Sequence, residues 1–518
     1  MKKLLLALLL VASACTNPDT RDGKALLDSF NGSSDNLLKS YIEQFNAADD
    51  EIYSFTHPND TAYEFLSGNV PYFTCPDKEL EKTYYFRWWT FRKHVRETPM
   101  GYIVTEFLPD VPWAGKYNSI NCPANHHFNE GRWIKNPEYL DNYARFWMAK
   151  DGGSAHVYTF AAATAVYDFY KVHNDTQLLA DLYPALKENF SEWINKRRDE
   201  TGLFWQIDGY DGMEVSASGS LAPDNSGYRA TINTFMYGNL KSLASIAEIL
   251  GQKDDAADYQ KQAEELKSLI NGKLWDAEAH FYKVIPRNGK NELSPYREEH
   301  GFTPWLFDIP LDEYSDAWRQ LTDSAGFAAP FGPTTLERRS PAFELTYTGH
   351  ECKWNGPSWP YSTTITLKAL SNYIHTYPSK VLDKNDFYAL LSTFSNAHRL
   401  EDKCWIDENI NPLTGYWMSR TMLIERGSYI KERGKDYNHS SFCDLIISDL
   451  VGIRPQPGRK VSIEPLIPAS WSSYSLTNVH YHNHCIDIVY DAAKGYFIYL
   501  DGKIAHSSRN VEDCTIRL

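Results

Sequence analysis

Apolar residues recur at helical spacing, three or four positions apart, over much of the chain. The segments that show this pattern most clearly are 139–147, 155–174, 176–197, 230–250, 255–274, 311–322, 362–377 and 385–397. Consecutive segments predict helical hairpins, and the loops between hairpins are rich in Gly, Pro, Trp and acidic residues. The pattern therefore predicts a toroid of helical hairpins that carries its functional loops at one end.

The pattern changes after Cys443. Residues 460–518 alternate apolar and polar side chains in short runs that are separated by turns. A period of two residues is typical of β-strands, so this region predicts a small C-terminal β module packed on the helical part.

The first 20 residues combine two lysines, an apolar run from Leu4 to Val11 and a patch of small residues that ends at Cys15. This pattern predicts a secretory signal that is too short to span a bilayer. The VASAC ending resembles a bacterial lipobox, which implies a signal peptide at 1–14, lipidation of Cys15 and a polar linker at 15–34. An ordinary cleaved signal is the alternative. With a lipidated Cys15 the protein is expected in the bacterial cell envelope, lipid-anchored on the periplasmic or the outer-membrane surface.

Composition favours a carbohydrate ligand. Aromatic residues make up 14% of the chain and the formal net charge is −15. A strongly acidic chain argues against nucleic acid, whose phosphates require a basic surface. Aromatic rings suit sugars because the C–H faces of a sugar stack on them, although aromatic residues are also ordinary core material.

No metal site or cofactor is predicted. The cysteines after Cys15 are scattered without a CxxC pair, so they indicate neither a zinc site nor a disulfide framework. The pair His126–His127 lacks further ligands at suitable spacing, and the histidines of HYHNH (480–484) fit an exposed strand face. Calcium is left open by analogy alone, since no compact set of oxygen ligands demands it.

Two acidic loops are the candidate catalytic elements. Asp208 and Asp211 lie in DGYDGMEVSASGS (208–220) near Trp205 and Tyr210, and aromatic neighbours tend to desolvate a carboxyl group and raise its pKa. The alternative for this loop is a turn with capping aspartates. The second loop, WIDENINPLTGYW (405–417), holds the neighbouring acids 407 and 408 before a turn, and its alternative is an acidic turn that faces water. On different hairpins of one toroid, the two loops can face each other across its mouth.

Further substrate-binding candidates lie between residues 106 and 133. Glu106 and Trp113 belong to EFLPDVPW, and Arg132 and Trp133 end NHHFNEGRW. An arginine fork binds acids or hydroxyls and an indole offers a platform for a sugar, while a structural salt bridge is the alternative for Arg132.

Several motifs, in the same order along the chain, resemble the six-hairpin (α/α)6-barrel glycosidases. The similarity covers residues 77–454 and is closest to the group that contains glycoside hydrolase family 63 and the mannosylglycerate hydrolases, with trehalases more distant. DGYD resembles the SGxDN loop of that group, with Asp211 at the position of the general acid. ENINPLTG resembles its ExYxPxTG segment, with Glu408 at the position of the general base. HGFTPW and KWNGPSWP resemble the loops that shape the sugar pocket, and they contribute His300, Trp305, Trp354 and Trp359.

Two departures stand out. Gly212 occupies a position where the group usually has Asn, and Ile410 replaces the ring of ExYxP. Either loop could therefore serve a different sugar.

The resemblance implies a mainly α protein with an N-terminal segment at 35–76, an (α/α)6 catalytic barrel at 77–454 and a β domain at 455–518. It implies an exo-acting inverting α-glycosidase that removes a terminal sugar from an extracytoplasmic glycan or oligosaccharide. Asp211 would then be the acid and Glu408 the base, roughly 6.5–9.5 Å apart. Asp208 and Glu214 would hold sugar hydroxyls or tune the acid.

Two other classes stay open. A polysaccharide lyase on a similar toroid would need a Tyr or His base and basic residues to neutralise a uronate. A glycan-binding lipoprotein without catalysis would keep the pocket alone. The oligomeric state is not predicted.

Overall fold

The computed structural model describes residues 18–518 except 55, 347–348, 429 and 431. The predicted signal peptide at 1–14 and the predicted lipidation site Cys15 lie outside the described residues. Within the described part of the chain, no helix is both long enough and apolar enough to cross a membrane.

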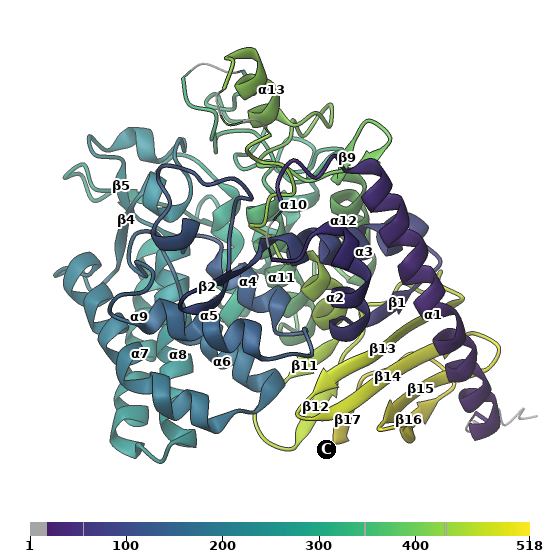
Figure 1. Ribbon diagram of the computed structural model, residues 1–518. Helices are drawn as coiled ribbons and strands as arrows, with labels where there is room; N and C mark the ends of the chain where they lie inside the picture. Colours follow the sequence, from purple (N-terminus) through teal and green to yellow (C-terminus); the bar gives the residue numbers. More distant parts are fainter. Residues whose placement is uncertain (1–17, 55, 347–348, 429, 431) are drawn as a thin grey trace, which may run out of the picture.

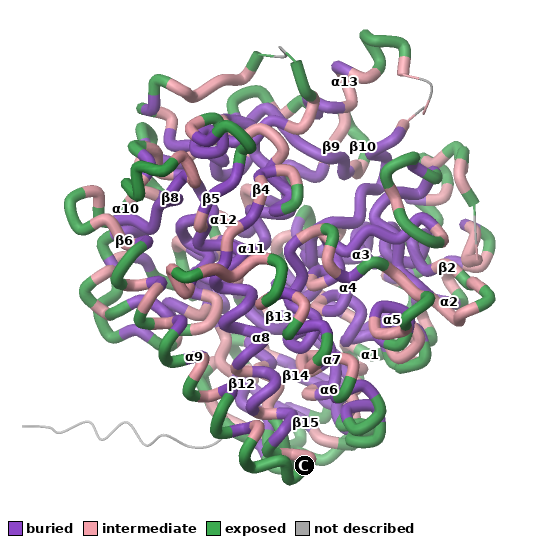
Figure 2. The backbone as a smooth tube through the Cα atoms, turned by 90° about the vertical axis from the view of Figure 1, so that its left-hand side faces the viewer, coloured by how far each residue is buried: buried purple, intermediate pink, exposed green. Residues whose placement is uncertain are grey.

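Six helical elements form a closed inner ring. They are α4 (Ala124–Gly131), α6 (Ala162–His173), α8 (Ala230–Ile249), the 3₁₀ helix η5 (Glu299–Phe307), α11 (Pro360–Thr376), and α14 (Phe442–Asp444) continued by the π-helix η7 (Leu445–Leu450). Each element packs against the next, and α14 packs against α4 to close the ring. These elements are almost wholly buried in the centre of the molecule (Figure 2). The predicted (α/α)6 toroid is confirmed.

An outer layer covers this ring. It comprises α3 (Lys78–His94), α5 (Glu138–Met148), α7 (Thr176–Arg197), α9 (Lys253–Leu274), η6 (Asp312–Trp318) with α10 (Arg319–Thr322), and α12 (Lys384–Ala397). Helix α9 shows why these segments fold so: its buried residues Ala256, Tyr259, Ala263, Leu266, Ile270 and Leu274 form one face, and its other face is polar. The predicted helix at 155–174 begins only at Ala162, and the one at 311–322 is mostly 3₁₀.

The N-terminal region contradicts one prediction. The polar linker predicted for residues 15–34 is wrong from Thr20 onward, because helix α1 (Thr20–Ala48) begins there with Asp19 as its N-cap. Leu26 and Leu27 are buried against the C-terminal domain, in a cluster with Val489, Phe497 and Tyr499. Apolar residues at helical spacing within a polar stretch explain the difference.

The C-terminal domain is built from two antiparallel sheets, as Figure 1 shows at its lower right. The larger sheet has the order β1 (Tyr72–Thr74), β13 (Ser473–Tyr481), β14 (His484–Asp491), β15 (Gly495–Leu500) and β16 (Lys503–Ser508). The smaller has β11 (Ile453–Pro455), β12 (Lys460–Ile463) and β17 (Cys514–Arg517). The N-terminal region therefore donates both a strand and α1 to this domain. The HYHNH run is a hairpin turn with positive φ at His482 and Asn483, and not one continuous strand face.

Most of the small elements lie in the connections between helices. They include α2 (Ala62–Asn69), β2 (Val95–Thr98), β3 (Gly101–Val104), β4 (Trp205–Ile207), β5 (Ser226–Tyr228), β6 (Trp275–Asp276), β7 (Phe281–Tyr282), β8 (Ile285–Pro286), β9 (Arg399–Leu400), β10 (Lys403–Cys404) and α13 (Met418–Glu425). The connections that carry β4, β5, β9 and α13 rise at the end of the toroid that is uppermost in Figure 1. Each of these connections leads into an inner element, so the toroid gathers them at one end.

Candidate active site

A cavity of about 300 Å³ is lined mainly by segments that precede inner helices. Its walls come from five parts of the chain: Glu106, Phe107 and Trp113; Cys122; Tyr158; Gly212 and Glu214; and, in the last third, His350, Glu351, Cys352, Trp354, Trp359, Tyr361, Glu408, Arg433, Tyr437 and His439. Both acidic loops contribute a residue to this cavity, as predicted, but not the same pair of residues.

Glu408 is held from two sides. The guanidinium of Arg433 donates to Oε1 from Nε at 2.7 Å and lies 2.5 Å from it through Nη2. The thiol of Cys352 lies 3.6 Å from the other oxygen, Oε2. Arg433 also donates to Glu351 through Nη1 at 2.9 Å. Arg433 thus forks between two carboxylates, and although burial raises the pKa of Glu351, its hydrogen bond with Arg433 holds that pKa below the ordinary value.

Glu214 lines the same cavity in a different environment. The indole Nε1 of Trp354 donates to its Oε2 at 3.0 Å. Burial, with a smaller contribution from the charge of Glu408, raises the pKa of Glu214 to about 7. A carboxyl group with this pKa carries a proton in weakly acidic solution, which is what a general acid requires.

Glu106 contributes a third carboxyl group to the wall, and its side chain is buried. Burial raises its pKa to about 8, and the hydroxyl of Tyr437 donates to Oε1. The main-chain nitrogen of Asn438 donates a hydrogen bond to the carbonyl of Glu106 at 3.1 Å. Glu106 therefore presents a protonated carboxyl group near neutral pH.

Asp211 does not line the cavity. It lies in the 3₁₀ turn η3 (Asp208–Asp211), where its carboxylate accepts hydrogen bonds from Thr159 Oγ1 at 2.6 Å and from Thr231 Oγ1. Burial raises its pKa, and these two hydroxyls oppose the rise. The structure thus brings Glu214, and not Asp211, into one cavity with Glu408.

The sequence contained a signal for this difference. DGMEV (211–215) can also be aligned with the SGxDN pattern, three residues further along, with Gly212 at the glycine position and Glu214 at the acid position. With this alignment the extra methylene of Glu replaces Asp at the acid position, and Val215 stands where Asn is usual.

Asp208 supports the loop from behind. Its carboxylate faces the guanidinium of Arg229, and both side chains are almost fully buried. Its Oδ2 accepts hydrogen bonds from Ser216 through the main-chain nitrogen at 3.3 Å and Oγ at 3.0 Å. A Cβ at Gly219 would collide with this carboxylate, so glycine is required there.

Three of the predicted tryptophans do line the cavity. Trp354 and Trp359 stack with their ring centroids 4.4 Å apart. Trp113 is 45% exposed, and its ring meets Phe107 edge to face. A buried pair of rings together with an exposed one offers an inner wall and an outer platform for sugar rings.

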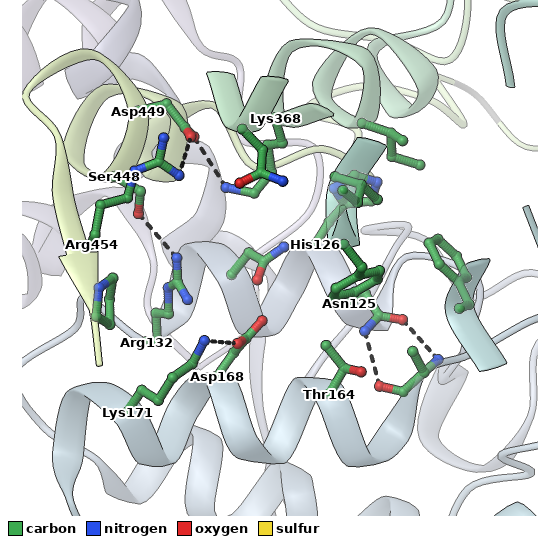
Figure 3. A pocket seen from close by; sticks show the side chains of 18 of the residues that line it. Asn125, His126, Arg132, Thr164, Asp168, Lys171, Lys368, Ser448, Asp449 and Arg454 are labelled. Carbon is green, nitrogen blue, oxygen red and sulfur yellow. Dashed lines mark hydrogen bonds and ion pairs between the residues drawn. The ribbon is translucent and has the colours of Figure 1, made fainter. Parts of the chain in front are cut away.

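Arg132 and Trp133 lie elsewhere. They follow α4 rather than precede it, so they are at the opposite end of the toroid. There Asp444 accepts hydrogen bonds from Arg132 Nη2 at 2.7 Å and from Trp133 Nε1 at 2.7 Å. Arg132 lines a second cavity of about 280 Å³ with Lys171, Lys368 and Arg454. Figure 3 shows Lys171 paired with Asp168, and Lys368 and Arg454 paired with Asp449. The structural salt bridge is the interpretation that the structure supports for Arg132.

The remaining candidates are also outside the cavity. Trp305 is fully buried against Trp318. His300 lies 3.3 Å from Glu298 and lines a small internal space. Trp205 is stacked by Arg287, whose guanidinium carbon is 4.0 Å from the ring centroid. Tyr210 is exposed, with its ring centroid 6.0 Å from that of Tyr158 in the cavity wall.

Sequence reasoning missed the segment that supplies Arg433, Tyr437 and His439. It precedes the inner element α14, so its place in the chain was the available signal. His439 packs on Tyr437 with ring centroids 3.7 Å apart, and burial holds the pKa of His439 well below its ordinary value. This histidine is therefore neutral.

Comparison with known proteins agrees with the geometry. The toroid and its carboxyl-lined cavity are those of a glycoside hydrolase. Residues 116–440, more than half of the chain, match the family described as mannosylglycerate hydrolase MGH1-like glycoside hydrolase domain. The chain belongs to this family of glycoside hydrolases. Residues 454–503 match the C-terminal domain of glycosyl hydrolase family 65.

Three individual proteins illustrate the similarity. A solved structure named sialidase is 34% identical, with a TM-score of 0.88 over 93% of this chain and 44% of that chain. The glycoside hydrolase family 63 mannosylglycerate hydrolase of Thermus thermophilus is 16% identical, with a TM-score of 0.52 over 70% of this chain and 98% of that chain, and it shows the same fold. An uncharacterized protein of Borreliella burgdorferi is 22% identical over 47% of this chain and 49% of its own length. The chain thus spans about half the length of the first and the last of these.

Proposed function

We propose that the protein is an exo-acting inverting α-glycosidase in which Glu214 is the general acid and Glu408 the general base. The observation that carries this proposal is that both carboxyl groups line one cavity with opposite partners. Glu214 meets an indole in a desolvated wall, whereas Glu408 meets the guanidinium of Arg433. Two carboxyl groups whose environments push their protonation apart form an acid and base pair. The proposal replaces Asp211 by Glu214 as the acid.

In the proposed reaction the protonated Glu214 transfers its proton to the glycosidic oxygen as the C–O bond breaks. Glu408 removes a proton from a water molecule, whose oxygen bonds to the anomeric carbon from the opposite face. The products are a free sugar of inverted configuration and the alcohol of the leaving group. Two proton transfers then return both carboxyl groups to their starting states through solvent.

Cavity size supports exo action. A volume of about 300 Å³ suits one terminal sugar unit better than a long chain, which needs an open groove. Trp113, exposed beside the cavity, provides a ring for the sugar or aglycone on the leaving side.

The charge of the cavity favours a neutral sugar. Of the four carboxyl groups in its wall, Glu106 and Glu214 hold protons near neutral pH, and the other two, Glu351 and Glu408, already share the arginine that lines the cavity. An anionic sugar would bring a further negative charge into this desolvated space, which is costly. We therefore propose that uronates and sialic acids are not the substrates, although a relative is named sialidase. The same charge balance disfavours a lyase, which must neutralise a uronate.

The test is hydrolysis of a panel of aryl α- and β-glycosides, sialosides and oligosaccharides, with product anomers followed by NMR. We expect release of a neutral monosaccharide with inverted configuration from an α-glycoside. Glu408→Gln should lower kcat by ~10²–10⁴-fold. Glu214→Gln should lose a similar factor with poor leaving groups and much less with 2,4-dinitrophenyl glycosides, which need no protonation.

Asp211→Asn is the matched comparison. The activity of this variant should depend on the leaving group in the same way as that of the wild type, because Asp211 has no access to the glycosidic oxygen. If Asp211→Asn is the variant rescued by a good leaving group, the assignment to Glu214 is wrong. Retention of configuration would refute the inverting mechanism, and cleavage of sialosides would refute the charge argument.

A further inference from the structure

One short segment, residues 351–354, lies between the two acidic loops and is fixed to both. Lys353 forms a parallel bridge with Val215, and the main-chain nitrogen of Trp354 donates to the Val215 carbonyl at 2.8 Å. On the other side, Asn409 Nδ2 donates to the carbonyl of Glu351 at 3.1 Å. Val215 directly follows Glu214 and Asn409 directly follows Glu408. The segment is therefore attached next to each of the two carboxyl groups.

The side chains of this segment alternate as in a strand. Cys352 and Trp354 are two residues apart and both line the cavity, while Lys353 does not line it and forms an ion pair with Glu344 at 2.7 Å. A spacing of two thus places one sulfur and one indole side by side on the cavity face.

Each of these two side chains meets one carboxyl group. The indole Nε1 of Trp354 donates to Glu214 Oε2 at 3.0 Å, and the thiol of Cys352 donates to Glu408 Oε2 at 3.6 Å. Burial raises the pKa of the Cys352 thiol well above its ordinary value, so the sulfur keeps its proton and acts as a donor. Arg433 occupies Oε1 of Glu408 alone, which leaves Oε2 as the oxygen available to water.

We propose that Cys352 and Trp354 are positioning residues that set the orientation of the base and the acid, through one hydrogen bond each from a shared extended segment. This inference rests on the proposed roles of Glu214 and Glu408. Oε2 of Glu408 is the oxygen that accepts the proton of water, and the thiol orients it. The segment fixes the separation of the two carboxyl groups because it is bonded beside both.

The pH profile of kcat/KM reports the two contacts separately. A donor to a carboxylate stabilises the charged form, so its removal makes ionisation harder. Loss of the indole N–H raises the pKa of Glu214 and moves the basic limb to higher pH. Loss of the thiol moves the acidic limb, which reports the base, to higher pH. The ionisable groups that line the cavity with this pair or lie beside it are Glu106, Cys122, Tyr158, His350, Glu351, Cys352, Tyr361, Asp407, Arg433, Tyr437 and His439.

The experiment measures kcat, KM and the pH profile for Cys352→Ala, Cys352→Ser, Trp354→Phe and the wild type, on the best glycoside of the panel. Cys352→Ala should lower kcat about fivefold to tenfold with little change in KM and move only the acidic limb, by about half a pH unit or more. Cys352→Ser keeps a hydrogen-bond donor, so its kcat and the position of its acidic limb should lie close to those of the wild type. Trp354→Phe keeps a ring and should move only the basic limb. Cys485→Ala is the control, since Cys485 lies in β14 of the C-terminal domain and does not line the cavity, and both limbs should stay in place.

A uniform drop in activity with unmoved limbs in Cys352→Ala and Trp354→Phe would overturn the inference, because a merely structural role has that result. Equal behaviour of Cys352→Ser and Cys352→Ala would overturn the role of the thiol. Failure of the proposed function looks different: the wild type would then hydrolyse nothing, or Glu214→Gln and Glu408→Gln would stay active. If Glu214→Gln and Glu408→Gln both abolish hydrolysis but the limbs do not move in Cys352→Ala and Trp354→Phe, the proposed function holds and only the positioning inference is wrong.

Discussion

The buried pair of Asp208 and Arg229 gives the sharpest stability prediction. Arg229 is fully buried, and among the described residues its guanidinium has no hydrogen-bond partner besides Asp208. Burial lowers the pKa of Arg229 to about 10, with Glu298 as the nearby charge that opposes the shift. The group remains charged at neutral pH. Replacing Asp208 by Asn therefore leaves a buried charge without its partner.

Removal of one partner from such a pair costs ~3–5 kcal/mol. At ~1.4 kcal/mol per tenfold, a loss of ~4 kcal/mol lowers the folding equilibrium constant roughly a thousandfold. We expect Asp208→Asn and Arg229→Met each to show a loss of this size in urea unfolding followed by tryptophan fluorescence. The double variant should lose less than the sum of the single losses, with a coupling energy of ~2–3 kcal/mol, because neither member of the pair remains as a buried charge without the other.

Asp141→Asn is the matched control. Asp141 pairs with Arg145 at 2.8 Å on the surface, where both side chains are partly exposed, so the change should cost less than ~1 kcal/mol. Additive losses in the Asp208 and Arg229 double variant, or single losses as small as that of the control, would refute the reasoning. The same variants should lower kcat, because Asp208 holds Ser216 two residues after Glu214.

The remaining predictions concern pH, ligand contact and location. The basic limb of kcat/KM should fall near pH 7, since Glu214 must be protonated and its pKa is about 7; a limb above pH 9 would contradict this. The folded-state pKa of Glu106, about 8, exceeds that of an unfolded carboxyl, about 4.3, so its contribution to stability is full below pH 4 and is lost as the pH rises to 8. Glu106→Gln should therefore gain in Tm relative to the wild type between pH 5 and 8, and a constant difference would be the contrary result. Trp113→Ala should raise KM about fivefold to tenfold for substrates with a ring in the leaving group, with an unchanged KM as the contrary result. Cys15→Ala should abolish incorporation of labelled palmitate in a bacterial host, unless the signal is an ordinary cleaved one.

The helical part of the fold was predictable because each hairpin repeats one local pattern. An amphipathic segment such as α9 needs only its own sequence to show which face is buried. The 3₁₀ character of η5 and η6 was not predictable, since it depends on how these short pieces fit between neighbours. Residues 35–46 were predicted as a helix, but the first part of α1, residues 20–34, was missed because its few apolar residues are diluted by polar ones, and their partners lie at the far end of the chain.

The site was predictable in part for a related reason. Glu408 and Trp354 carry motif positions and do line the cavity. The choice between Asp211 and Glu214 as the proposed acid depends on two alignments of one loop, three residues apart, which spacing alone could not decide. Arg132 shows the converse. An arginine is chemically suited to bind a substrate, but Arg132 follows α4 and therefore lies at the other end of the toroid. Whether a residue precedes or follows an inner helix was therefore more informative than the chemistry of its side chain.

The pairing of β1 with β13 affects how the protein is made. A strand near the start of the chain needs a partner that is synthesised about 400 residues later, and Leu26 and Leu27 need Val489 and Phe497 for cover. During synthesis the first helix therefore exposes apolar side chains until almost the whole chain has emerged. A chaperone that binds the nascent N-terminal region would protect it over this interval. Loss of the last strands through a premature stop would leave the first helix uncovered and prone to aggregation, however well the toroid itself had closed.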